Sequence, residues 1–106
     1  MSLDRVIAAL IDLGLSRLDA EIYVYLSKKG SRKTSTLARN LNYSRQKIYP
    51  SLNKLQKLGL LTRHQLLYSA LPFEEALELL IKLNKQQAEA MSESKKELFV
   101  NWKTEE

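Results

Sequence analysis

The sequence predicts a mainly α-helical fold with one small two-stranded β-sheet and a long C-terminal helix. Apolar residues recur every three or four positions through most of the chain, which is the period of an amphipathic helix. The exception is residues 60–71, where two short apolar runs flank a polar turn, a pattern typical of a β-hairpin. From residue 73 to about residue 102 nothing interrupts the helical pattern. The 106 residues suffice for one domain with its own core.

The first two helices have recognisable ends. Residues 3–13 carry apolar side chains at helical spacing, and a glycine follows them. Ser16 and Asp19 have the three-residue spacing of a capping box, in which each side chain accepts a hydrogen bond from the other residue's backbone N–H. We therefore expect a second helix that runs to about Lys28 and is stopped by Gly30.

A short third helix and a fourth helix follow, joined by a tight turn. Either Thr34 or Ser35 can cap the third helix. The sequence Asn-Tyr-Ser at residues 42–44 forms the turn, because asparagine tolerates a positive φ and serine caps the next helix. The fourth helix is predicted from about Ser44 to Leu58, with its leucines inward and its basic and polar residues outward.

Pro50 conflicts with this fourth helix. As the sixth helical residue it removes one backbone hydrogen bond and clashes with a preceding carbonyl, at a cost of about 3 kcal/mol. Either the helix kinks at Pro50, or its regular part begins later than Ser44. Both alternatives change the direction of the side chains from Arg45 to Lys47.

The last part of the chain predicts a hairpin and a long helix. Strands are expected at residues 60–63 and 67–71, around a turn at His64 and Gln65, and Pro72 suits the first position of the final helix. Thirty helical residues span about 45 Å. Two helices joined by a tight turn and followed by a hairpin define a winged helix-turn-helix, so the fold class is a winged helix-turn-helix with a long C-terminal helix.

The charge of the chain is concentrated in its middle. The net charge is +5, yet residues 22–73 contain ten lysines and arginines and no acidic residue. A solvated protein surface normally mixes both signs. A segment of this length with only one sign attracts a polyanion, of which nucleic acid is the common example.

Other classes of function are disfavoured. The chain has no cysteine and a single histidine, His64, with no acidic residue near it in the sequence, and its three glycines are isolated. Nucleophilic triads, thiolate metal sites and glycine-rich phosphate loops therefore lack their residues. We expect no enzyme, no metal site and no cofactor. No apolar run reaches the length of a membrane span and no signal peptide is recognisable, so we expect a cytoplasmic protein.

Three stretches resemble a known family. They are LGLSRLDAEIYVYLSKKG, TSTLARNLNYSRQKIYPSLNKLQKLGLLTR and YSALPFEEALELL, and together they run from Leu13 to Leu80. They resemble the DNA-binding domain of the archaeal TrmB-type transcriptional regulators. The resemblance implies a winged helix that binds operator DNA as a dimer. Many such regulators add a C-terminal sugar-sensing domain, which these 106 residues do not contain, so we expect the DNA-binding domain alone and leave any small-molecule effector unknown.

The resemblance implies a recognition-helix role for residues 44–49 and a wing role around residues 63–65. The chemistry of the side chains agrees, since Arg45 can pair with a guanine edge and Gln46 with an adenine edge in the major groove. Tyr49 is expected to touch a thymine methyl or a phosphate, unless it packs beside Ile48. The predicted DNA-binding set is Arg32, Lys33, Thr34, Ser44, Arg45, Gln46, Lys47, Tyr49, Asn53, Lys54, Arg63 and His64.

The final helix carries a heptad pattern that predicts a homodimer. We assign residues 1–72 to the winged helix and residues 73–106 to a C-terminal dimerisation helix, because one domain cannot bury so long a seam and operators are usually two-fold symmetric. The alternative is that the helix packs on its own domain and ends in a solvated tail. The predicted dimer interface comprises Leu3, Ile7, Leu77, Leu80, Asn84, Gln87, Met91 and Leu98.

The function predicted from the sequence is a sequence-specific regulator that binds double-stranded DNA as a homodimer. The alternative function is a winged-helix module that contacts protein or structured RNA without binding an operator, since a fold does not by itself decide a function.

Overall fold

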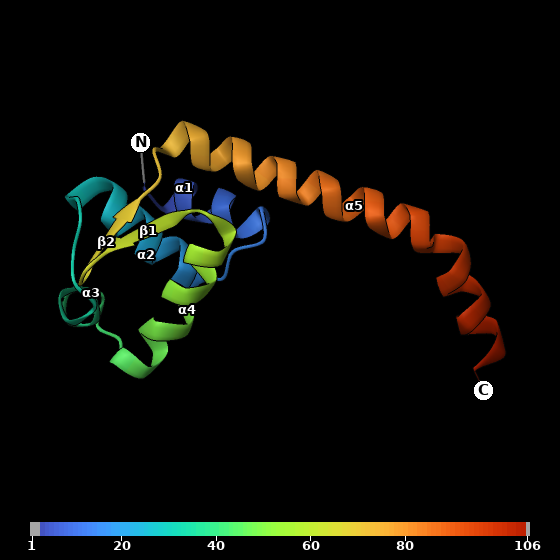
Figure 1. Cartoon of the computed structure of the whole chain (residues 1–106), viewed down its shortest axis with the longest axis horizontal. Coiled ribbons are helices and arrows are strands. Elements are labelled where there is room, and N and C mark those ends of the chain that lie inside the picture. Colours follow the sequence, from blue (N-terminus) through green and yellow to red (C-terminus); the bar gives the residue numbers. More distant parts are fainter. Residues whose placement is uncertain (1–2, 106) are drawn as a thin grey trace.

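A computed structural model of the chain describes residues 3–105 and confirms the winged helix-turn-helix (Figure 1). Four helices form a body, a two-stranded antiparallel sheet lies against it, and one long helix leaves it. The elements are α1 Leu3–Asp12, α2 Arg17–Lys29, α3 Thr34–Leu41, α4 Arg45–Leu58, β1 Leu61–His64, β2 Leu67–Ala70 and α5 Phe73–Thr104.

Helix α2 is the centre of the body. It packs against α1, α3, α4 and β2, and its apolar side chains Ile22, Tyr23 and Leu26 are at most 2% exposed. From the other elements Leu10, Leu37, Leu52 and Leu60, among others, complete one continuous core. Burying such side chains is the main stabilising contribution to the fold, at roughly 1.5–3 kcal/mol each.

Local hydrogen bonds set the helix-turn-helix in place. The capping box at α2 is present as predicted, with hydrogen bonds of 3.0 Å in both directions between Ser16 and Asp19. At the turn before α4, Asn42 has a φ of 62°, as its residue type predicts, and Ser44 caps α4. The Tyr43 hydroxyl donates to Glu21 at 3.2 Å and so ties the turn to α2.

The start of α3 differs from the prediction. Lys33, not Thr34 or Ser35, is its N-cap residue, and no side chain caps the helix there. Thr34 is already the first helical residue, so its hydroxyl is in the wrong place to accept from the next turn. The result is a helix end whose first N–H groups are left for another acceptor.

The sheet forms the wing. β1 pairs with β2 from Leu61 opposite Ala70 to His64 opposite Leu67, so the turn is at Gln65 and Leu66, one residue later than predicted. Gln65 takes a left-handed conformation with a φ of 56°. Arg32 adds a short bridge to the edge of the sheet through two backbone hydrogen bonds with Tyr68.

Pro50 is accommodated inside α4. The helix begins at Arg45 and continues without a break through Pro50 to Leu58, which excludes the later start considered above. The backbone nitrogen of Pro50 has no hydrogen to donate to Gln46, one turn earlier, so one helical bond is missing.

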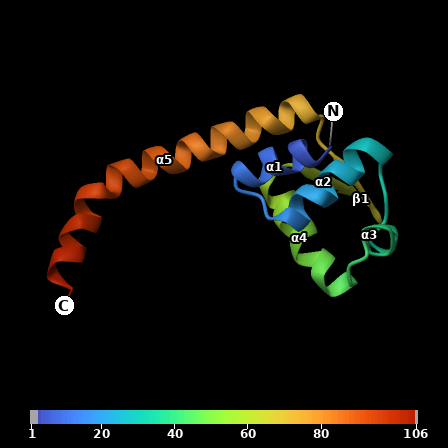
Figure 2. The ribbon, with the colours of Figure 1, turned by 180° about the vertical axis from the view of Figure 1, so that it is seen from behind.

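Helix α5 lies on the body only at its start and then projects away from it (Figure 2). Ala76 and Leu80 are buried, and Asn84 donates hydrogen bonds of 2.7 Å to the carbonyls of Leu13 and Leu80. Beyond these turns the side chains are mostly exposed, and the protein is 51 Å long. Pro72 was predicted as the first residue of α5, but it is the N-cap, and the helix begins one residue later at Phe73. Although α5 is long, no helix within residues 3–105 has an apolar stretch that could cross a membrane.

We expect Pro50→Ala to stabilise the protein, because alanine restores the missing N–H donor to the Gln46 carbonyl in an exposed part of α4. The free energy of unfolding measured by urea denaturation should rise by about 1–3 kcal/mol. Lys57→Ala, on the same helix, is the control and should change it by less than about 0.5 kcal/mol. No gain for Pro50→Ala would mean that the helix bends there at little cost.

Candidate nucleic-acid interface

Helix α4 has one face that is mostly apolar and buried and an opposite face that is polar and exposed. Ile48, Leu52 and Leu55 are 0% exposed and anchor the helix in the core. The opposite face carries exposed side chains, which are Arg45, Gln46, Lys47, Tyr49 and Asn53. Tyr49 is 46% exposed, so it does not pack in the core beside Ile48. The first two turns of α4 therefore present a polar, cationic surface to the solvent.

A hollow of about 260 Å³ lies beside this face of α4. Three elements line it: the start of α3, the outer face of α4 and the wing. Six of its residues belong to the DNA-binding set predicted above, and three arginine or lysine side chains line it without any acidic residue. The lining residues are Lys33, Thr34, Ser35, Arg45, Tyr49, Asn53, Arg63, Leu66 and Tyr68.

The electrostatics of the hollow favour an anion. Lys33, Arg45 and Arg63 come from three different elements and converge there. The uncapped N-terminus of α3 lies at the same place, and a helix N-terminus carries a partial positive charge with free N–H donors. These features are additive because each attracts negative charge to the same hollow.

The wing arginine is held in a defined position. The Arg63 Nε donates to the carbonyl of Gln65 at 2.8 Å, and its guanidinium carbon lies 5.6 Å from the centre of the Tyr68 ring. The cation–π contact and the hydrogen bond restrict the side chain and reduce the entropy that a bound ligand would cost. His64 is exposed on the same strand but does not line the hollow.

Other members of the predicted set lie outside the hollow. The Arg32 guanidinium donates to the Ser31 carbonyl at 2.8 Å, and Ser44 is occupied as the cap of α4. Gln46 and Lys47 are exposed further along the outer face of α4. Ser35, Leu66 and Tyr68 also line the hollow and were not predicted to do so. For Tyr68 the reason is that its pairing with Arg32 has no signal in the sequence.

Lys54 has an internal partner, which the sequence analysis did not foresee. Its Nζ lies 2.8 Å from Oδ2 of Asp19, whose side chain is 2% exposed, whereas the lysine side chain is 47% exposed. Lys54 therefore pairs with a buried carboxylate of α2, and its contact with a DNA phosphate stays a prediction. The ion pair holds α4 against α2.

Asp19 is charged in the fold because its partners outweigh its burial. Burial by itself raises the pKa of Asp19, but Lys54, the Ser16 backbone and the hydroxyls of Ser51 and Ser16 together bring the pKa below its usual value. The same carboxylate thus caps α2 and binds α4.

The side chains predicted for a dimer interface have mixed positions. Leu80 is 3% exposed and belongs to the core of its own chain, so it is not available to a second chain. Leu77 and Ile7 are half-buried against the same core. Leu3, Met91 and Leu98 are 46–57% exposed, and Asn84 and Gln87 are exposed as well. Within residues 3–105 no three histidine, aspartate or glutamate side chains come together as metal ligands.

A winged helix-turn-helix with a cationic outer face is typical of DNA-binding transcription regulators. Residues 10–74, more than half of the chain, match the family described as "Sugar-specific transcriptional regulator TrmB", and the chain belongs to this family. It is therefore a transcriptional regulator with a DNA-binding helix-turn-helix. Comparison with curated proteins gave no match, nor did comparison with solved structures.

We expect Lys54→Met to destabilise the protein, because it leaves the Asp19 carboxylate buried without its cationic partner. The free energy of unfolding should fall by about 1–3 kcal/mol, the range for losing a hydrogen bond to a buried charge. Lys57→Met, three residues away on α4, is the matched control. Equal stability of the two variants would show that the ion pair contributes nothing to the fold.

The pH dependence of stability should report on Asp19. Its pKa is lower in the folded than in the unfolded chain, so the stabilisation is complete above about pH 5 and is lost as the pH falls through 4 towards the folded pKa. Urea unfolding between pH 2.5 and 6 should show this decline in the wild type and a shallower one in Asp19→Asn. Identical slopes would contradict the assignment.

Proposed function

We propose that this regulator binds double-stranded DNA in a sequence-specific manner, as a homodimer, with α4 in the major groove. The observation that carries the proposal is the cationic hollow shared by α3, α4 and the wing, beside an exposed α4 face held in place by core leucines. A helix fits the major groove, where each base pair presents a distinct pattern of donors and acceptors.

Base recognition is assigned to the first turns of α4. The exposed side chains of Arg45 and Gln46 come from its first turn, which is the end that enters the groove in helix-turn-helix proteins. Arginine pairs with two acceptors of guanine and glutamine with adenine. Tyr49 lies one turn further on, where it can touch a thymine methyl or a phosphate.

Phosphate binding is assigned to the surroundings of the hollow. Lys33 supplies a charge and Thr34 a hydroxyl at the uncapped start of α3, and Arg63 supplies a second charge from the wing. Such contacts position a protein on the duplex without reading its sequence. Arg32, Ser44 and Lys54 have partners within the chain. We assign the other nine residues of the predicted set to DNA.

The proposed role is binding rather than catalysis, and a mobility-shift assay tests it. The protein should retain duplex DNA more tightly than RNA of equal length, and the affinity should fall steeply with salt. Selection of bound fragments from a random duplex pool should return one preferred sequence. Preference for structured RNA, or retention of neither polymer, would support the alternative function as an RNA- or protein-contact module.

Two variants should weaken DNA binding in different ways. Arg45→Ala should cost about 1–3 kcal/mol on the preferred sequence and little on random DNA, because it removes a base contact. Lys33→Ala should weaken binding to all sequences alike and reduce the slope of log affinity against log salt by about one.

Lys82→Ala, which removes an exposed lysine from α5, is the control for both and should bind as the wild type does. A uniform loss from Arg45→Ala would remove Arg45 from base recognition.

A further inference from the structure

Helix α5 carries an apolar stripe that packs on the body at Leu77 and is largely exposed along the rest of its length. Seven apolar residues fall within about 80° of its circumference at 3.6 residues per turn. Five of them are 39–78% exposed, Leu77 is half-buried, and Ala88 is the small residue in the middle. The stripe consists of Phe73, Leu77, Ile81, Ala88, Met91, Phe99 and Trp102. It overlaps the predicted dimer interface at Leu77 and Met91 but does not include Leu80, which is in the core.

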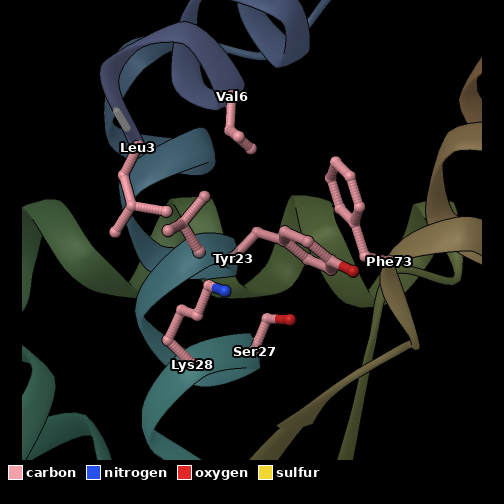
Figure 3. A pocket seen from close by; sticks show the side chains of 7 residues that line it. Leu3, Val6, Tyr23, Ser27, Lys28 and Phe73 are labelled. Carbon is pink, nitrogen blue, oxygen red and sulfur yellow. The ribbon is translucent and has the colours of Figure 1, made fainter. Parts of the chain in front are cut away.

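An apolar pocket of about 330 Å³ opens at the start of α5. In Figure 3, Val6 and Phe73 lie near the ring of Tyr23, Leu3 lies on the far side of the pocket, and Lys28 and Ser27 lie along one edge. Phe73 is thus both a wall of the pocket and the first residue of the stripe. Trp102 lies at the other end of the same helix and, at 78%, is the most exposed side chain of the stripe.

We infer that two copies of the chain pair through antiparallel α5 helices, with Trp102 of each copy seated in the pocket of the other. This inference rests on the homodimer of the proposed function and adds its orientation and its contacts. With the two-fold axis at Ala88, position i of one helix faces position 176 minus i of the other. Counted along the helix, Phe99 then faces Leu77, and Trp102 comes within one residue of the position facing Phe73, although α5 bends towards its C-terminal end (Figure 1).

The small side chain of Ala88 allows the helices to approach closely at the axis. This single interface buries both the stripe and the pocket, since the two stripes face each other and each pocket receives a tryptophan. The interface is isologous, as a two-fold axis requires.

The charges of α5 favour the antiparallel orientation. Glu74, Glu78, Lys96 and Lys103 all lie on one flank of the stripe, and in an antiparallel pair the same flanks of the two helices face each other. Glu74 then lies beside Lys103 of the second copy, and Lys96 of the second copy lies between Glu78 and Lys82, with axial offsets of at most about 3 Å. A parallel pair would place the start of one α5, with three acidic and no basic residues between 73 and 81, beside the same segment of the other.

Disulfide trapping distinguishes the orientations, and the chain has no cysteine to interfere. Ala88→Cys lies on the proposed axis and should form a covalent dimer on mild oxidation. Lys95→Cys lies on the same stripe, but its two copies would be about 21 Å apart along the axis, far beyond the roughly 7 Å limit between Cα atoms of a disulfide. Cross-linking at Ala88 alone supports the inference. Cross-linking at both positions, as in a parallel pair, or at neither overturns it.

Trp102 is the only tryptophan of the chain, so its fluorescence shows whether its side chain lies in the pocket of the second copy. On dilution from dimer to monomer, followed by light scattering, its fluorescence should shift to longer wavelength and become easier to quench with acrylamide. Leu3→Asp, at an exposed wall of the pocket, should produce the shifted spectrum in the dimer, whereas Ala8→Asp on the same helix should not. If the protein is a dimer but the emission of Trp102 changes neither on dilution nor with Leu3→Asp, Trp102 does not lie in the pocket, and this part of the inference is wrong. If light scattering shows only a monomer, both this inference and the proposed homodimer are wrong. DNA binding is tested separately by the mobility-shift assay.

Discussion

The arrangement of the DNA-binding surface depends on the carboxylate of Asp19. It accepts the Ser16 N–H to cap α2 and lies 2.8 Å from Lys54 of α4, so one buried group fixes the start of one helix and the position of the next. A buried charge without partners would cost several kcal/mol, and here the partners are supplied by two elements. Helix α4 is consequently held by its buried leucines and by the ion pair of Lys54 with Asp19, and its opposite face is exposed to the solvent.

This constraint explains how so basic a segment can fold. Like charges on residues 22–73 repel one another, yet the core leucines and the Asp19 pair hold the helices while the remaining cations stay at the surface. Lys33, Arg45 and Arg63 converge on one hollow. An anion bound in the hollow would relieve the repulsion between them and would thereby stabilise the fold.

Much of the fold was predictable because its signals are local. The capping box of Ser16 and Asp19, the positive φ of Asn42 and the stop of α4 at Gly59 each depend on a few neighbouring residues. The hairpin turn was placed one residue early, since a left-handed Gln65 has no strong sequence signal. The cap predicted for α3 was wrong for a related reason. The backbone path from the wing edge at Arg32 determines whether Lys33 or Thr34 is the last residue before the helix.

The sequence by itself determined the winged helix-turn-helix, the outward face of α4 and the basic character of the middle segment. These follow from periodicity and composition, which are properties of the chain read in order. Only the tertiary structure decided that Lys54 pairs with Asp19, that Leu80 is in the core, and that Ser35, Leu66 and Tyr68 join the hollow. Those outcomes depend on contacts between residues tens of positions apart, and such contacts exist only once the helices have packed.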